Sequence, residues 1–115
     1  MRVRRSFAFE AAHSLPRHPG KCRRLHGHSF RLVVTVARPV DPATGLALDF
    51  GELKTTVHEA AISRLDHAHL NDFLDDPTAE RIAEWIWGRL APVLPGLEEV
   101  ELFETVRCSV VYRGE

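Results

Sequence analysis

One stretch of alternating residues constrains the fold of this chain most. Between residues 26 and 36 every second position is apolar or a histidine: His26, His28, Phe30, Leu32, Val34 and Val36. Neighbouring side chains of a β-strand point to opposite faces, so this period of two predicts a long strand. One face of that strand is apolar, and its first two positions carry imidazoles.

Two further strands are expected near this one. An aromatic and β-branched stretch predicts a strand over residues 3–13. The turn sequence at residues 41–45, Asp-Pro-Ala-Thr-Gly, predicts a fold-back into a short strand at residues 46–49. That short strand would form a hairpin with the long strand.

The last strand is expected over residues 100–112. Its apolar row contains one carboxylate, Glu104, and one thiol, Cys108. A carboxylate among apolar residues must be paired or must bind something. Cys108 is interpreted as a small packing residue. For Glu104, an ion pair with an arginine, or a bulge that turns the side chain outward, remains an alternative to ligand binding.

Helical spacing occurs in two segments. Asp49, with Glu52 three residues later, resembles a capping box, and apolar residues at helical spacing then predict a helix over residues 50–65. These apolar residues are Phe50, Leu53, Val57, Ala61 and Leu65. A second helix is expected between Thr78, its N-cap, and Pro92. The order β-β-β-α-α-β indicates one α+β domain over residues 1–115.

Length and composition exclude several classes of protein. A chain of 115 residues can remove about two-thirds of its unfolded surface from water, which leaves little area for a deep pocket within one subunit. A site shared between subunits is therefore plausible. No apolar run approaches the roughly 18 residues of a membrane span, and no signal-peptide pattern is seen, so a cytoplasmic protein without a membrane partner is expected. Two cysteines do not make a disulfide scaffold.

Charge is distributed unevenly along the chain. Residues 1–38 hold nine basic side chains and one acidic, whereas residues 39–115 hold six basic and 15 acidic. The two halves could simply face each other or a partner subunit, or the basic half could attract an anionic ligand. Charge alone does not decide between these.

His26 and His28 are the strongest candidates for chemistry. Two residues apart in a strand, both imidazoles project to one side, about 6–7 Å apart at their Cα atoms. His13, at the end of the first strand, is the natural third ligand. Three histidines with an open position are typical of a catalytic zinc site. Ordinary strand-end histidines, with His13 in the core, are the alternative.

Cys22 and the pair Asp66–His67 are further candidates. Cys22 lies beside Lys21, Arg23 and Arg24, and positive charge favours the thiolate, the form that acts as nucleophile or base. An inert loop thiol or a fourth zinc ligand is the alternative. An aspartate beside a histidine can orient the ring for general acid or base work, although such neighbours are also common as solvated caps.

Together, in this order, the motifs resemble the 6-pyruvoyl-tetrahydropterin synthase family over nearly the whole chain. They are Phe9-Glu10-Ala11-Ala12-His13, Cys22 to Phe30 with His26-Gly27-His28, Val40-Asp41-Pro42 with Thr44-Gly45, Asp49-Phe50, Leu65-Asp66-His67 with Leu70-Asn71, Glu104-Thr105 and Tyr112-Arg113-Gly114-Glu115. Three residues separate Cys22 from His26, which is similar to the bacterial branch, the 6-carboxy-tetrahydropterin synthases of queuosine biosynthesis. The animal-type members have a longer spacing.

The resemblance implies a fold and a set of site residues. The fold is the tunnelling fold (T-fold): an antiparallel sheet with two helices on one face, oligomerising into a barrel as a homo-oligomer with active sites at subunit interfaces. It implies zinc on His13, His26 and His28, catalysis by Cys22, Asp66 and His67, and pterin binding by Glu104 with Thr105. From charge alone, Lys21, Arg23 and Arg24 are candidates for the substrate's triphosphate.

The implied reaction converts 7,8-dihydroneopterin triphosphate and water to 6-carboxy-5,6,7,8-tetrahydropterin, acetaldehyde and triphosphate. The runner-up is a 6-pyruvoyl-tetrahydropterin synthase, which eliminates triphosphate without carbon–carbon cleavage. A zinc-stabilised binding module is the alternative outside the enzymes. A nucleic-acid partner is not expected, since the basic segment lacks interleaved aromatics and no recognition-helix cluster is seen.

Overall fold

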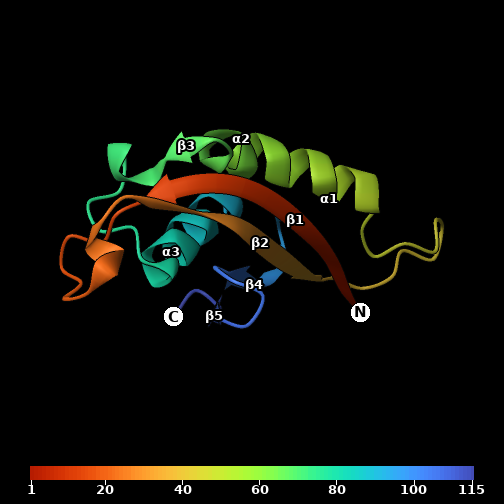
Figure 1. Cartoon of the computed structure of the whole chain (residues 1–115). Helices are drawn as coiled ribbons and strands as arrows, with labels where there is room; N and C mark the ends of the chain where they lie inside the picture. The colour runs from red at the N-terminus through yellow and green to blue at the C-terminus, as the bar shows by residue number, and fades with distance from the viewer.

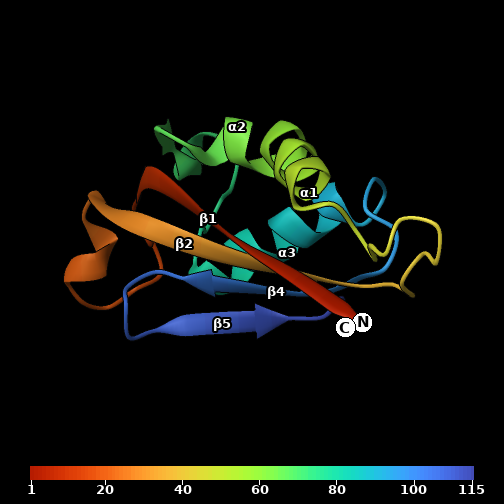
Figure 2. The ribbon, with the colours of Figure 1, turned by 90° about the vertical axis from the view of Figure 1, so that its right-hand side faces the viewer.

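A five-stranded sheet forms one layer of the molecule, and helices cover one of its faces. The computed structural model describes all residues, 1–115. The strand order is β3-β1-β2-β4-β5, with β1 (Arg2–His13), β2 (His26–Ala37), β3 (Ala68–His69), β4 (Leu97–Phe103) and β5 (Ser109–Tyr112). Figure 1 shows β1 as a long arched strand, with the helices behind the sheet. Figure 2, a side view, shows the same two layers.

The two long strands confirm the predicted pattern, and they pair with each other along their whole length. β1 and β2 pair antiparallel, so that His13 lies opposite His26 and Phe9 opposite Phe30. The Phe9 and Phe30 rings stack with centroids 4.9 Å apart. The alternating apolar side chains of β2 are buried under the helices. The ends of β1 and β2 that carry histidines therefore lie at one edge of this core.

The predicted strand at residues 46–49, and its hairpin with the long strand, are wrong. The turn itself forms, with the Gly45 amide donating to the Asp41 carbonyl at 2.7 Å. Helix α1 (Phe50–Val57) begins directly afterwards, capped by the Asp49 side chain. Too few residues remain between turn and cap for a strand, and β2 is already flanked by β1 and β4.

The predicted continuous strand at residues 100–112 is also wrong, because a turn divides it into β4 and β5. The Thr105 hydroxyl oxygen accepts hydrogen bonds from the amides of Arg107 and Cys108, at 3.3 and 3.1 Å. These bonds compete with a continuous ladder. Val106 at the tip is 92% exposed, and Cys108, expected to pack in the core, is exposed as well. Glu104 consequently lies at the start of a turn and not in an apolar row.

The predicted helix at residues 50–65 forms in three parts: α1, a π-helical turn η2 (His58–Ile62) and α2 (Ser63–Leu65). The buried positions Leu53, Val57, Ala61 and Leu65 are each four residues apart. In a regular α-helix each such step drifts by about 40° around the axis. The wider π turn takes up the excess and keeps Leu65 in the core. Phe50, placed in the apolar row by sequence, is 60% exposed.

The second predicted helix is confirmed as α3 (Ala79–Leu90). The Thr78 side chain caps it by accepting from the Arg81 amide. Its buried residues pack against β4 and β5. Two short 3-10 turns complete the chain: η1 (Lys21–Arg23) between β1 and β2, and η3 (Leu70–Asp72) after β3.

Gly96, in the turn that leads into β4, is expected to tolerate no side chain. Its φ is +85°, and a Cβ there would collide with the Ala37 carbonyl oxygen. We expect Gly96→Ala to lower the free energy of unfolding by about 2–4 kcal/mol, from strain and overlap together. The matched control is Gly88→Ala, on the exposed face of α3 with nothing within 4 Å of the added methyl. Gly88→Ala should raise the free energy of unfolding by about 0.5–1 kcal/mol. Chemical denaturation of both variants measures this, and equal effects would contradict the assignment.

Candidate metal centre and adjoining groups

Three histidines converge where β1 ends and β2 begins. The ring centroids of His13 and His26 are 4.6 Å apart, those of His26 and His28 are 4.9 Å apart, and those of His13 and His28 are 5.2 Å apart. His13 is fully buried, and Phe30 packs edge-on against His13 and His28. The antiparallel register therefore brings together the three side chains singled out by sequence.

Backbone carbonyls fix the orientation of two of these rings. Nδ1 of His13 lies 2.8 Å from the Pro77 carbonyl oxygen, and Nδ1 of His26 lies 2.7 Å from that of Arg24. A carbonyl only accepts, so each Nδ1 carries the proton and each Nε2 is left free as a ligand. The Nε2 atoms of all three histidines are buried without a hydrogen bond of normal geometry. Orphaned, inward-pointing donor atoms of this kind fit a bound metal ion.

Glu104 completes the group. Its Oε1 lies 2.9 Å from Nε2 of His28 and 3.4 Å from Nε2 of His13, and its side chain is 26% exposed. Four potential ligand atoms, one from each residue, lie within 4.8 Å of one another. Three imidazoles and a carboxylate are donors that suit zinc and similar divalent ions. The arginine pair and the outward bulge considered for Glu104 do not occur.

The pKa shifts within this group of four side chains favour its interpretation as a metal site. Burial lowers the pKa of His28, outweighing the attraction of Glu104, and so keeps its ring in the neutral form that binds metals. Burial also opposes the charge on His13, but the contacts with Glu104 and the Pro77 carbonyl raise its pKa overall. Contact with His13 lowers the pKa of Glu104 despite burial. The contact with the imidazoles thus favours the ionised carboxylate of Glu104, the form that can act as a metal ligand.

Cys22 lies in η1, within the loop that joins the two histidine-bearing strand ends (Figure 1). The Leu15 amide donates to the Cys22 carbonyl at 2.9 Å and closes this loop. Asn71 anchors its start by two hydrogen bonds of 2.9 Å with the backbone of Ser14. The thiol is partly exposed and unpaired. The loop thus places Cys22 at the same end of the sheet as the histidines.

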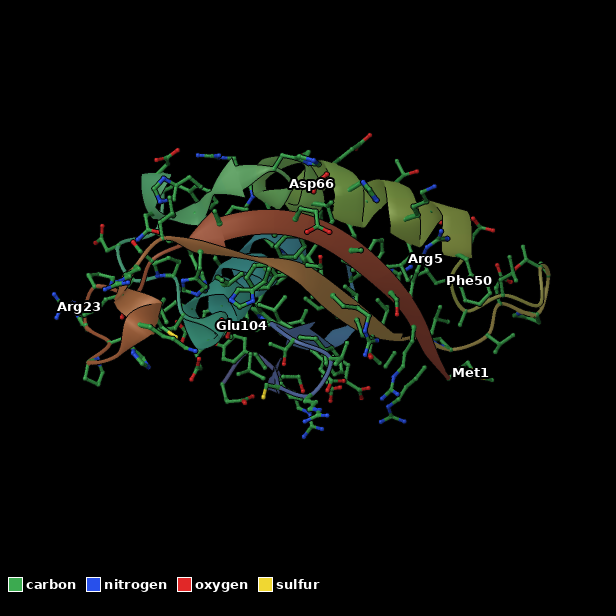
Figure 3. All side chains as sticks on the ribbon, viewed as in Figure 1. Met1, Arg5, Arg23, Phe50, Asp66 and Glu104 are labelled. Atoms are coloured by element: carbon green, nitrogen blue, oxygen red, sulfur yellow. The ribbon has the colours of Figure 1, made fainter.

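Lys21, Arg23 and Arg24 lie around the same turn. With Gly20 they line a hollow of about 520 Å³ that has no apolar lining residue. None of the three cations forms an ion pair. Figure 3 shows Arg23 at the outer end of the molecule, away from the sheet. These charges are available to an anionic ligand.

Asp66 and His67 are held together and tied to β1. His67 Nδ1 lies 3.1 Å from Asp66 Oδ1, which also accepts from the Glu10 amide at 2.9 Å. This backbone bond is the main reason why the pKa of Asp66 lies below its usual value. The His67 amide donates to the Glu10 carbonyl at 2.6 Å. The two side chains are therefore in contact, with the carboxylate held on β1 beside the imidazole.

His67 faces an open hollow on the sheet. Its side chain is 79% exposed, and its backbone has the positive φ of 60° that non-glycine residues rarely adopt. The hollow has a volume of about 420 Å³ and is lined in part by Glu10, Gly27, His28 and Ser29. Ser29 donates to the Glu10 carboxylate at 2.8 Å. Polar groups and His67 thus share one accessible surface.

Sequence reasoning missed the residues that hold the site through the backbone. The Pro77 and Arg24 carbonyls and the Glu10 peptide groups act regardless of side chain, so no residue type marks them. Asn71 was named only within a motif of the family resemblance, and no role was predicted for it. A polar residue between two apolar segments is nevertheless a usable signal for a side chain that binds the backbone. Thr105, predicted to bind substrate, instead accepts two amides of its own turn, which leaves its hydroxyl proton free to donate.

Comparisons with known proteins agree with this geometry. The model of the family described as 6-pyruvoyl tetrahydropterin synthase matches residues 2–115. The chain is 45% identical to a 6-carboxy-5,6,7,8-tetrahydropterin synthase of Synechocystis, over 96% of this chain and 91% of the relative. It is 40% identical to the 6-pyruvoyl tetrahydrobiopterin synthase of Homo sapiens, over 84% and 72%.

The fold is likewise similar to a solved structure. It matches that of Caenorhabditis elegans 6-pyruvoyl tetrahydropterin synthase with a TM-score of 0.90 and 25% identity, covering 100% of this chain and 96% of the other. No helix has the length and apolar character needed to cross a membrane.

Removing one imidazole should empty the metal centre. His26→Ala deletes one of three converging Nε2 donors, so we expect metal affinity to fall by more than about 100-fold, beyond the loss seen when an outer partner is removed. His58→Ala is the matched control, because His58 lies in η2 and its ring contacts Phe7. Elemental analysis of both purified variants measures bound divalent metal. Full metal content in His26→Ala would disprove the assignment.

Proposed function

The chain belongs to the 6-pyruvoyl tetrahydropterin synthase family, and we propose that it is a zinc-dependent 6-carboxy-5,6,7,8-tetrahydropterin synthase. Its substrates are 7,8-dihydroneopterin triphosphate and water. Its products are 6-carboxy-5,6,7,8-tetrahydropterin, acetaldehyde and triphosphate, so one carbon–carbon bond breaks and the pterin ring takes up two electrons. The enzyme is a carbon–carbon lyase that supplies an intermediate of queuosine synthesis.

The observation that carries this proposal is the convergence of three buried Nε2 atoms that form no hydrogen bond of normal geometry, beside the loop that carries Cys22. His13, His26 and His28 hold the zinc ion. When bound, zinc polarises the side-chain oxygens of the substrate and makes the neighbouring C–H bonds more acidic. The carbonyls of Pro77 and Arg24 keep two of the rings in the required tautomer.

Glu104 binds the pterin edge. A ring N–H and the exocyclic amino group present two parallel donors that match one carboxylate. Its lowered pKa keeps Glu104 in the ionised form. Oε1 faces the histidines, and the turn formed by Thr105 presents the side chain at the mouth of the metal centre. Thr105, with its free hydroxyl proton, assists in holding the same ring.

Cys22 and His67 move the protons. The Cys22 thiolate takes a proton from the substrate side chain as electrons shift into the pterin ring and triphosphate leaves. His67, oriented by Asp66, transfers the second proton before the carbon–carbon bond breaks. Lys21, Arg23 and Arg24 bind the triphosphate, and their lack of acidic partners within the chain supports this role.

Two open sheet edges support assembly into a barrel with sites between subunits. β3 covers only Ala11 and Ala12 of β1, and β5 pairs with β4 alone. Exposed edges of this kind tend to pair with another chain. A second copy could add its sheet there, and His67, exposed beside the open edge of β1, then lies in position to act at a neighbouring subunit.

The carboxy reaction is favoured over the pyruvoyl reaction by two features. The relative at 45% identity carries the carboxy name, and the loop has three residues between Cys22 and His26. The pyruvoyl synthase remains the second candidate, since relatives with that name align over 84% of the chain. Product analysis separates the two: acetaldehyde forms only in the carboxy reaction.

The deciding experiment incubates purified protein with 7,8-dihydroneopterin triphosphate and identifies the pterin and any aldehyde by mass spectrometry. We expect equal amounts of 6-carboxy-tetrahydropterin and acetaldehyde. A pyruvoyl product without acetaldehyde would favour the second candidate. No product, together with unfolding on zinc removal, would indicate a zinc-stabilised binding module.

The two cysteines should differ in importance. Both thiols are free and at least partly exposed, but only Cys22 lies in the cationic loop beside the metal centre. We expect Cys22→Ala to lower kcat by about 100-fold or more, the usual contribution of a positioned acid or base. Cys108→Ala should leave turnover within about twofold of the wild type, as expected of an exposed position outside the chemistry. Equal losses in two folded variants would contradict the role of Cys22.

Glu104→Gln should weaken pterin binding without loss of fold. The amide puts an N–H where the carboxylate accepts, so one contact becomes repulsive and one partner is left unpaired. The expected loss is on the order of 2–4 kcal/mol, or roughly 30- to 1000-fold in affinity. Calorimetry with a non-reactive pterin measures it, and elemental analysis checks the metal. Unchanged affinity would show that Glu104 contacts the histidines but does not bind the pterin.

A further inference from the structure

Only the short α2 separates the π turn η2 from the Asp66–His67 pair, and η2 accepts a hydrogen bond from a residue outside its own helix. The Ala60 carbonyl, in the middle of the turn, accepts a hydrogen bond from Arg89 Nε of α3 at 2.9 Å. π turns are rare and often occur at functional sites. The bond joins α3 to the helix that ends at the pair.

The backbone of η2 and three polar contacts lie between this bond and the His67 ring. The Asp66 amide donates at 2.9 Å to the carbonyl of Ile62, the last residue of η2. Asp66 Oδ1 accepts from the Glu10 amide at 2.9 Å and lies 3.1 Å from His67 Nδ1.

The π turn decides where Asp66 points. One residue more or less ahead of a helix end rotates that end by about 100°. With the extra residue taken up in η2, Leu65 is buried and Asp66 faces the Glu10 amide. A regular α-helix over the same residues would turn Asp66 away from β1 and leave His67 without its orienting carboxylate.

His67 itself needs external restraint. Its φ of 60° is a left-handed conformation that is unfavourable for an L-residue. Such conformations persist only where surrounding contacts over-determine them. The restraints here are the two backbone bonds to Glu10 and the helix end ahead of it.

We propose that Arg89 is a positioning residue: by holding the π turn η2 through Ala60, it sets the orientation of the Asp66–His67 pair. The inference rests on the proposed function, in which His67 transfers a proton. Arg89 forms no ion pair, and its guanidinium lies 5.6 Å from the centre of the Trp85 ring. Its hydrogen bond to Ala60 is therefore its one strong directional contact, and neither Asp66 nor His67 is touched by it directly.

The test compares three variants of the full chain in its metal-loaded form. Arg89→Met keeps the length of the side chain and its packing on Trp85 but removes the donor. Arg89→Lys keeps a cationic donor on a flexible stem and should act as a partial rescue. Arg81→Met is the matched control, since Arg81 is also an exposed arginine of α3 and pairs only with Glu84 on the same helix.

Two sets of measurements separate positioning from general stability. Carbon-13 NMR of the Asp66 carboxyl reports its pKa, and nitrogen-15 NMR of His67 reports which ring nitrogen carries the proton. In Arg89→Met we expect the pKa of Asp66 to rise toward its usual value and the Nδ1 proton of His67 to be shared with Nε2. We expect kcat to fall about tenfold with KM within twofold, a loss in the range that small misplacements cause. Arg89→Lys should recover part of both effects, and Arg81→Met should show neither.

The outcomes are distinct. Unchanged NMR signals at Asp66 and His67 in Arg89→Met overturn the proposal, whatever the activity. Altered signals with unchanged kcat also overturn it, because the orientation would then not matter for turnover. If the wild-type protein makes no tetrahydropterin product, the proposed function fails, while the NMR comparison still decides whether Arg89 orients the pair.

Discussion

The antiparallel register of β1 against β2 is the constraint on which the rest of the structure depends. It sets His13 opposite His26, and the core packing of Phe9 against Phe30 prevents a shift. A slip of one residue would turn every side chain of one strand to the other face. The same register that buries the apolar rows therefore brings together the histidines of the candidate metal centre, and the core and the candidate site share one set of contacts.

Both remaining parts of the candidate site are attached by hydrogen bonds to backbone groups of β1 or of Ser14, the residue that follows it. The loop that carries Cys22 follows the end of β1, and Asn71 holds the start of this loop by hydrogen bonds to the backbone of Ser14. The Asp66–His67 pair forms hydrogen bonds with the peptide groups of Glu10, which lies three residues before the end of β1. Because backbone groups of a paired strand are rigid, these attachments hold flexible loops and helix ends in fixed positions, as a preorganised catalytic site requires.

The uneven charge distribution has two physical consequences in different places. Near the start of the chain the basic half does face the acidic half, as in the pair Arg2–Glu98. The basic residues of the loop that carries Cys22 have no such partners and line a hollow of their own. Internal neutralisation is thus realised near the start of the chain, and the cations of the loop that carries Cys22 remain available to an anionic ligand.

The sequence by itself determined the elements with a local cause. Period-two spacing specified β1 and β2 with their histidine-bearing faces, and side-chain caps at Asp49 and Thr78 marked the starts of two helices. Tertiary structure decided the rest. Whether residues 46–49 form a strand depends on which edge of β2 is free, and the end of β4 depends on the Thr105 turn. The free edge of β2 and the Pro77 carbonyl that orients His13 are set by contacts between segments distant in sequence. The Thr105 turn and the Arg24 carbonyl act over two or three residues, but through backbone hydrogen bonds that the spacing of apolar residues does not encode.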